Sequence, residues 1–165
     1  MTEDERVASL DAFRETFSAV PAPVSIVTAS EAGVPVGTTV SAFCSLSAAP
    51  PLVLVALDLD SNTLRVIRET RRFGINVLAV GQEELALACA RKGGDKFANH
   101  PWHDEGGIPR LDEAIGWVRC DVQDELPGGD HAVVVGLVRE TEAHEGEPLI
   151  YYKREFHVPA PRRSR

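Results

Sequence analysis

Hydrophobic and polar residues alternate along most of this chain with the two-residue period of β-strands rather than the longer period of helices. Runs rich in β-branched and aromatic residues are separated by Gly, Pro, Asp or Asn, which is the usual pattern of strands joined by turns. Successive strand residues point to opposite faces, so each run can bury one face in a core. The pattern predicts strands within residues 24–29, 34–46, 51–57, 73–80, 114–123, 131–143 and 148–158.

Helical periodicity is confined to three segments. Residues 4–19 place Val7, Leu10, Phe13 and Phe17 on one face, which predicts an amphipathic helix. Two shorter helices are predicted nearer the middle of the chain, one over residues 62–69 and one over residues 82–91, the second ending in a glycine C-cap at Gly93–Gly94.

Strands therefore dominate, and the fold class predicted is mainly β (α+β), a closed or half-closed β-barrel with a few short helices. A nucleotide-binding βαβ fold is not indicated, because the chain has neither a GxGxxG motif nor a Walker loop. With 165 residues the chain is expected to form one domain over residues 1–158. The remaining PAPRRSR, residues 159–165, is predicted to be a flexible basic tail.

The segment GTTVSAFCSLSAAPP, residues 37–51, carries an unusual number of hydroxyl groups. At a period of two, its apolar face continues from Val36 through Leu46, while Thr39, Ser41, Ser45 and Ser47 lie on the other face. An edge strand with its polar face in water is one interpretation. Residues 34–57 carry no charged side chain, however, which favours a covered face that binds a neutral, flat, hydrogen-bonding ligand.

The helix predicted after this strand pair starts with good N-cap residues, Asp60, Ser61 and Asn62. A helix N-terminus offers unpaired backbone N–H groups and the positive end of the dipole, so it is a natural place to bind phosphate. The simpler interpretation is a capped helix. Together with the hydroxyl-lined strand just upstream, the two features indicate a site for a ring system and its phosphate tail.

A third candidate feature is GGDHAVVVG, residues 128–136, where a glycine turn brings Asp130 and His131 to the start of an apolar strand. His131 is either a hydrogen-bonded rim residue or a contact for a second substrate. Asp130 is expected to orient its ring by accepting a hydrogen bond from one ring nitrogen.

Composition narrows the possible partners. The net charge of −8 and the isoelectric point near 5.1 argue against a general affinity for nucleic acid or anionic membranes. No apolar run is long enough to suggest a membrane span, and the acidic start is unlike a signal peptide, so a cytoplasmic protein is expected.

Cys44, Cys89 and Cys120 are widely spaced and predicted to be buried, reduced thiols. His100 and His103 lack the partners of a clear metal site, so none is expected.

The sequence has no GxSxG or HExxH motif, no paired acids on one helical face and no cysteine beside a base, so hydrolysis and group transfer have weak support. Hydride transfer between two bound cofactors is consistent with this lack of catalytic motifs. In such a reaction the cofactors provide the reactive atoms and the protein only positions them.

Five motifs in order over roughly residues 12–158 resemble the flavin reductase-like family, which has the FMN-binding split-barrel fold. These proteins are the reductase components of two-component flavin-dependent monooxygenases. The motifs are GTTVSAFCSLSAAPPLVLVALD, SNTLRVIRETRRFGINVLAVGQEELA, DKFA, LPGGDHAVVVGLV and PLIYYKREF.

The resemblance implies a split β-barrel that forms a homodimer with flavin sites near the subunit interface. It also implies a set of contacts. His131 and Tyr152 are assigned to NAD(P)H, and Lys96 and Phe97 match the family's KFA. At Cys89–Ala90 many members have Phe-Ala, which leaves a flavin contact there open. The isoalloxazine and ribityl contacts would be Thr38, Thr39, Val40, Ser41, Ala42, Cys44 and Ser45, and the phosphate contacts would be Asp60, Ser61, Asn62 and Thr63.

The activity implied is that of an NAD(P)H:flavin oxidoreductase, which transfers hydride from nicotinamide C4 to N5 of FMN or FAD and releases reduced flavin to a partner monooxygenase. NADH and NADPH are both open as donors. An alternative is a non-catalytic flavin-binding or sensor protein on the same barrel, which would retain its flavin on gel filtration. A third possibility is a barrel that uses flavin to oxidise an organic substrate of its own.

Overall fold

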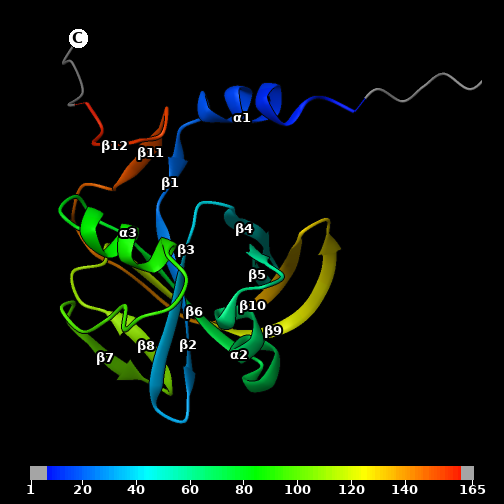
Figure 1. Ribbon diagram of the computed structural model, residues 1–165. Helices are drawn as coiled ribbons and strands as arrows, with labels where there is room; N and C mark the ends of the chain where they lie inside the picture. Colours follow the sequence, from blue (N-terminus) through cyan, green and yellow to red (C-terminus); the bar gives the residue numbers. More distant parts are fainter. Residues whose placement is uncertain (1–6, 161–165) are drawn as a thin grey trace, which may run out of the picture.

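The computed structural model describes residues 7–160, and these form a strongly bent β-sheet accompanied by short helices (Figure 1). Residues 4–6 of the first predicted helix and residues 161–165 of the predicted basic tail lie outside the described residues. The helices are α1 (Leu10–Ser18), α2 (Asn62–Thr70) and α3 (Glu83–Ala90). The strands are β1 (Ala22–Pro23), β2 (Ser25–Glu31), β3 (Val34–Val40), β4 (Phe43–Ala48), β5 (Pro51–Asp58), β6 (Arg72–Val77), β7 (Trp102–Glu105), β8 (Ile108–Leu111), β9 (Gly116–Gly128), β10 (His131–Ala143), β11 (Ile150–Tyr152) and β12 (Glu155–His157).

Seven strands make the main sheet, in the order β3-β2-β6-β9-β10-β5-β4 with every neighbouring pair antiparallel. The sheet curls until β3 also contacts β5, so it forms a half-closed, split barrel. The prediction of such a barrel is confirmed. Two further sheets are small, one of β1, β11 and β12 and one of β7 and β8.

The barrel interior is an apolar core that α2 covers. Fully buried side chains of the strands, such as Val27, Leu57, Phe73 and Val134, pack against Leu64 and the other apolar residues of that helix. A second cluster packs α3 against the opposite face of β2. These two cores explain why the apolar runs of the sequence appear on strands that are buried on both faces.

The hairpin of β7 and β8 was not predicted, because WHDE and IPRL lack a clear alternation. Its two strands are joined by Gly106 and Gly107, both at positive φ, and a Gly-Gly pair between short runs is a hairpin signal that the sequence did contain. A buried hydrogen bond attaches β8 to the barrel, because the Oδ1 atom of Asn76 accepts from the backbone N–H of Leu111 at 2.9 Å.

The prediction of one strand over residues 34–46 was wrong. The chain bends at Ser41 and Ala42, so that β3 pairs with β2 while β4 pairs with β5. The two strands lie at opposite edges of the main sheet. The alternation was read across this bend, and the hydroxyl groups before and after it therefore do not share one strand face.

The first helix is shorter than predicted. It begins at Leu10, because the hydroxyl of Ser9 accepts from the backbone N–H of Ala12 at 3.2 Å as an N-cap. None of its residues is buried: Phe13 and Phe17 are 53% and 59% exposed. Figure 1 shows α1 set apart from the barrel, and its Phe13 and Phe17 rings pack on each other while staying largely exposed.

The other two helices match their predicted positions. Ser61 caps α2, with its Oγ accepting from the backbone N–H of Leu64 at 3.4 Å. The predicted glycine C-cap of α3 was wrong, because the helix ends on Arg91 in an extended conformation. Gly93 and Gly94 follow at positive φ and shape the loop instead.

All three cysteines are free, but only two are buried. Burial raises the pKa of the Cys89 thiol to about 11 and that of Cys120 to about 12. Cys44 is exposed, contrary to the prediction, because it lies on β4 at the edge of the sheet. Within residues 7–160, no helix has both the length and the apolar character needed to cross a bilayer.

Candidate functional site

The described surface has an open groove of about 930 Å³. Three parts of the chain form its walls: β3 with the end of β2, the turn from β5 into α2, and the loop that follows α3. The barrel brings these segments together because β3 and β5 contact each other across its split. The lining residues are Glu31, Val34, Pro35, Val36, Gly37, Thr38, Asp58, Asp60, Ser61, Asn62, Thr63, Ala90, Arg91, Lys92, Gly93, Gly94, Asp95, Lys96, Phe97, Ala98 and Trp102.

One wall of the groove is the N-terminus of α2. The turn before the helix is fixed by Asp58, whose Oδ1 accepts from the backbone N–H of Asp60 at 2.7 Å. Ser61 then caps the helix, and Asn62 and Thr63 form its first turn at the groove. Backbone N–H groups in the first turn of a helix have no partner within the helix, so they can bind an anion.

The groove lining also includes a lysine in a fixed position. The Nζ of Lys96 donates to the carbonyl oxygens of Gly37 at 3.0 Å and Cys89 at 3.2 Å, which ties the loop to both β3 and α3. Lys96 is thus a structural clamp as well as a groove residue, rather than an ordinary surface lysine. An ammonium group has three N–H donors, so one remains for a ligand.

His131 lies next to the groove on the neighbouring strand. Its backbone is paired with that of Asp58, a groove residue, and directly paired residues point to the same face of a sheet. The Nδ1 of His131 is 2.7 Å from the Oδ1 of Asp130, as predicted. This hydrogen bond lowers the pKa of Asp130 and leaves Nε2 of the ring free to face a ligand.

The groove unites about half of the residues assigned from the sequence. They come from β3, from the start of α2 and from the segment after α3, which are distant in the sequence. Those that line it are Thr38, Asp60, Ser61, Asn62, Thr63, Ala90, Lys96 and Phe97.

The other assigned residues are not among those that line the groove. The Val40 and Cys89 side chains are buried in the two cores, and the hydroxyl of Thr39 donates to the carbonyl of Ala86 at 2.6 Å. Tyr152 belongs to the small sheet beside α1. Ser41, Ala42, Cys44 and Ser45 are exposed on the bend and the edge strand.

Several residues that line the groove were not identified as site residues from the sequence. Glu31 ends β2, and Arg91 and Lys92 follow α3, so none of them lies within a recognisable motif. Trp102 reaches the groove from β7, the strand that was not predicted. These positions are set by the folding of the chain around the barrel, and no local signal marks them.

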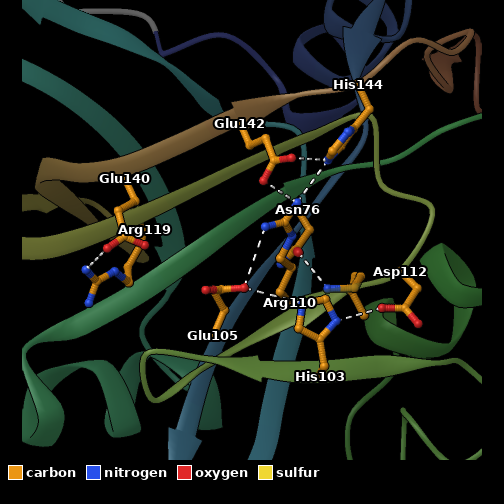
Figure 2. Close-up of polar contacts among 10 residues, drawn as sticks. Asn76, His103, Glu105, Arg110, Asp112, Arg119, Glu140, Glu142 and His144 are labelled. Atoms are coloured by element: carbon orange, nitrogen blue, oxygen red, sulfur yellow. Dashed lines mark hydrogen bonds and ion pairs between the residues drawn. The ribbon is translucent and has the colours of Figure 1, made fainter.

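A second group of charged side chains, shown in Figure 2, shares no residue with the groove lining. At its centre Arg110 donates to Glu142 at 2.7 Å and to the Nε2 of His144 at 2.9 Å. His103 binds Asp112 through Nδ1 at 2.8 Å. The Arg110 contacts attach β8 to the end of β10, and the His103–Asp112 contact lies within the hairpin region itself. We assign this cluster to stability rather than to ligand binding.

The groove therefore offers binding rather than reactive groups. It combines a helix N-terminus, a fixed ammonium and apolar side chains such as Val36 and Phe97, with a histidine at its edge. This combination fits a ligand that has a flat ring system and an anionic tail, as a flavin nucleotide does. Any redox chemistry would be that of the bound ligands.

Comparisons with known proteins agree with this geometry. Residues 17–159 match the model of a family described as "Flavin reductase like domain". The reductase component of a 4-nitrophenol 4-monooxygenase/4-nitrocatechol 2-monooxygenase from Rhodococcus opacus is 42% identical over 152 residues, which are 92% of this chain and 82% of that protein.

Two further relatives are named for their cofactors. An NADH:riboflavin 5'-phosphate oxidoreductase from Streptomyces pristinaespiralis is 33% identical over 154 residues, 90% of this chain and 88% of that protein. The structure of an NADH:FAD oxidoreductase from Streptomyces globisporus, in complex with NAD and FAD fragments, superimposes with a TM-score of 0.87. It is 29% identical and covers 95% of this chain and 98% of its own.

Proposed function

Because this chain belongs to the flavin reductase-like domain family, we propose that it is a flavin reductase that uses NADH to reduce FMN or FAD and supplies the reduced flavin to a separate monooxygenase. The observation that carries the proposal is the groove, whose lining includes the start of α2 and Lys96 and which lies next to His131. Relatives named for NADH with riboflavin 5'-phosphate and with FAD support both flavins. The relative named as a reductase component supports the partner.

The protein's part in the reaction is to hold two ligands in place. The N–H groups of Asn62 and Thr63 and the ammonium of Lys96 bind the flavin phosphate, while Thr38 contacts the flavin from β3. His131, oriented by Asp130, contacts the nicotinamide. When flavin and nicotinamide are bound, they would supply the redox chemistry, a hydride passing from nicotinamide C4 to flavin N5. No protein acid or base is required for that step, because the two bound ligands would exchange the hydride directly.

Anaerobic turnover tests this function. Protein at low concentration is mixed with an excess of FMN or FAD and with NADH or NADPH, and flavin and nicotinamide absorbance are followed. Bleaching of many flavin molecules per protein, faster with NADH than with NADPH, is the expected result. If one flavin binds tightly and stays oxidised with either nucleotide, the protein is a flavin binder and not a reductase.

The proposal includes a homodimer, because two surfaces of the chain expose apolar groups to solvent. One is the edge strand β4 and the other is the apolar face of α1. The edge strand β4 carries no charged residue and exposes Leu46 at 49%. Charged side chains normally protect such an edge from pairing. Helix α1 exposes Phe13 and Phe17, which pack on each other with ring centroids 4.6 Å apart. We infer that a second copy of this chain covers both surfaces, because two copies related by symmetry present the same two surfaces to each other.

Replacing Phe13 and Phe17 together with glutamate is expected to dissociate the dimer, because two charges would be buried at its interface. Light scattering coupled to gel filtration should give twice the 17.9 kDa chain mass for the unaltered protein and the single mass for the variant. A matched control is Val34→Glu, which changes another exposed apolar residue, 62% exposed, away from α1. A monomeric unaltered protein would contradict the homodimer.

The proposed location is the cytoplasm, which supplies the NADH that the reaction consumes. Three free cysteines, one of them exposed, support a reducing compartment.

A further inference from the structure

Arg65 does not line the groove, yet it holds two residues that do. Its guanidinium lies on the first turns of α2 and donates from Nε to the Oδ1 of Asn62 at 3.0 Å. Its two terminal nitrogens donate to both carboxylate oxygens of Glu31, at 3.0 and 2.8 Å. Asn62 and Glu31 are both groove residues, one at the α2 wall and one at the end of β2.

The contact with Arg65 decides which way the Asn62 amide points. A guanidinium has only donors, so the atom of Asn62 that faces it must be the carbonyl oxygen. The amide nitrogen is thereby left as the free end of the side chain. A residue in the first turn of α2 then adds a side-chain N–H donor to the backbone N–H groups at the phosphate site.

The contact with Glu31 offsets an unfavourable negative charge at the groove. A carboxylate on the groove wall would repel a phosphate, and the groove already contains Asp58 and Asp60. The bidentate pair with Arg65 offsets the charge of Glu31, and its hydrogen bonds lower the pKa of that carboxyl group, so Glu31 stays ionised and paired. Glu69, one turn along the helix, accepts from Arg65 at 2.9 Å and helps to fix the guanidinium.

We propose that Arg65 is a positioning residue for the phosphate end of the flavin, directing the Asn62 amide to the phosphate and offsetting the charge of Glu31. The inference rests on the proposed function, because it assumes that a flavin nucleotide occupies the groove. Arginine is suited to this role because its planar guanidinium holds its donors in a fixed fork, which pairs with both oxygens of Glu31 while Nε reaches Asn62. The compact ammonium of lysine has no such fixed geometry.

The test compares FMN with riboflavin, which has the same ring and ribityl chain but no phosphate. Dissociation constants are measured by quenching of flavin fluorescence, without NADH. Arg65→Met is expected to weaken FMN binding about fivefold and to leave riboflavin binding unchanged, since the charge interaction lies at the surface and is modest. Arg65→Lys should be intermediate, and steady-state kinetics should show a raised KM for FMN at an unchanged kcat.

Glu31→Gln supplies a rescue. In the Arg65→Met background the carboxylate of Glu31 has lost its partner, so neutralising it should restore part of the FMN affinity. The matched control is Arg68→Met, on the same helix and equally exposed, whose guanidinium pairs with Glu125 at 2.6 Å away from the groove. It should leave the affinity for both flavins unchanged.

The outcomes separate this inference from the proposed function. If Arg65→Met weakens FMN and riboflavin binding equally, or weakens neither, Arg65 has no role at the phosphate and the inference is overturned while the flavin site stands. If the unaltered protein binds FMN no better than riboflavin, there is no phosphate site and the inference is also overturned. If it binds neither flavin, the proposed function itself is wrong.

Discussion

Replacing His131 with alanine is expected to lower kcat/KM for NADH about tenfold, which corresponds to about 1.4 kcal/mol, while the dissociation constant for flavin changes less than twofold. The reason is its place beside the groove: it is paired with Asp58 at the end of β5, its side chain is 43% exposed, and Asp130 fixes its ring. Stopped-flow reduction with varied NADH, together with a fluorescence titration of flavin, measures both quantities.

The control for His131 is another histidine in a closely similar setting. His103 is 50% exposed and its Nδ1 is 2.8 Å from Asp112, but it belongs to the cluster of Figure 2 and not to the groove. His103→Ala should therefore leave both parameters unchanged. Asp130→Asn should produce a smaller loss than His131→Ala, because the ring stays but loses its charged partner. An unaltered kcat/KM in His131→Ala would remove His131 from the nicotinamide site.

The second large effect is on stability. Gly136→Ala is expected to lower the free energy of unfolding by about 3 kcal/mol, because overpacking a dense core forces its neighbours to move. A Cβ on Gly136 would lie 2.5 Å from the Cζ of Phe73 and 2.8 Å from the Cβ of Cys120. Phe73 is fully buried, and the Cβ of Cys120 is fixed to its backbone, so neither can turn aside.

Urea unfolding followed by circular dichroism, at one protein concentration, measures this change. Gly33→Ala is the comparison, since nothing lies within 4 Å of its Cβ and only its φ of +83° opposes a side chain. It should cost about 1 kcal/mol. A loss in Gly136→Ala no greater than that of Gly33→Ala would mean that β10 can shift to accommodate the methyl group.

The contrast between predicted and observed elements follows from the range of the interactions. The capped start of α2 and the turn before His131 were predicted correctly, because Ser61 and Gly129–Asp130 act on residues within four positions of themselves. The bend at Ser41 was missed, since it is fixed by which strands β3 and β4 pair with, and the hydroxyl alternation continues across it. The five motifs identified the family correctly.

The residues assigned to the candidate site differ in the same way, some having a local sequence signal and others depending on tertiary packing. Asp60, Ser61 and Asn62 were found because a helix start has a local signature, Thr63 was added by the family resemblance, and all four line the groove. Val40 was assigned by its place in a motif, and Cys89 stands where many family members have Phe-Ala, a contact that was left open. The depth of their burial depends on packing that the sequence does not report. Tyr152 lies in the small sheet of β1, β11 and β12, outside the groove of its own chain.

By itself, the sequence determined the strand-rich character of this protein, the positions of α2 and α3, and the capped start of α2, because these depend on periodicity and on hydrogen bonds between near neighbours. Only the tertiary structure decided that β3 and the start of α2 face each other across one groove with Lys96 between β3 and α3. It also decided that Arg65 pairs with Glu31, 34 residues away. Such contacts arise when the sheet curls into a barrel, and strand pairing over long separations leaves no local trace.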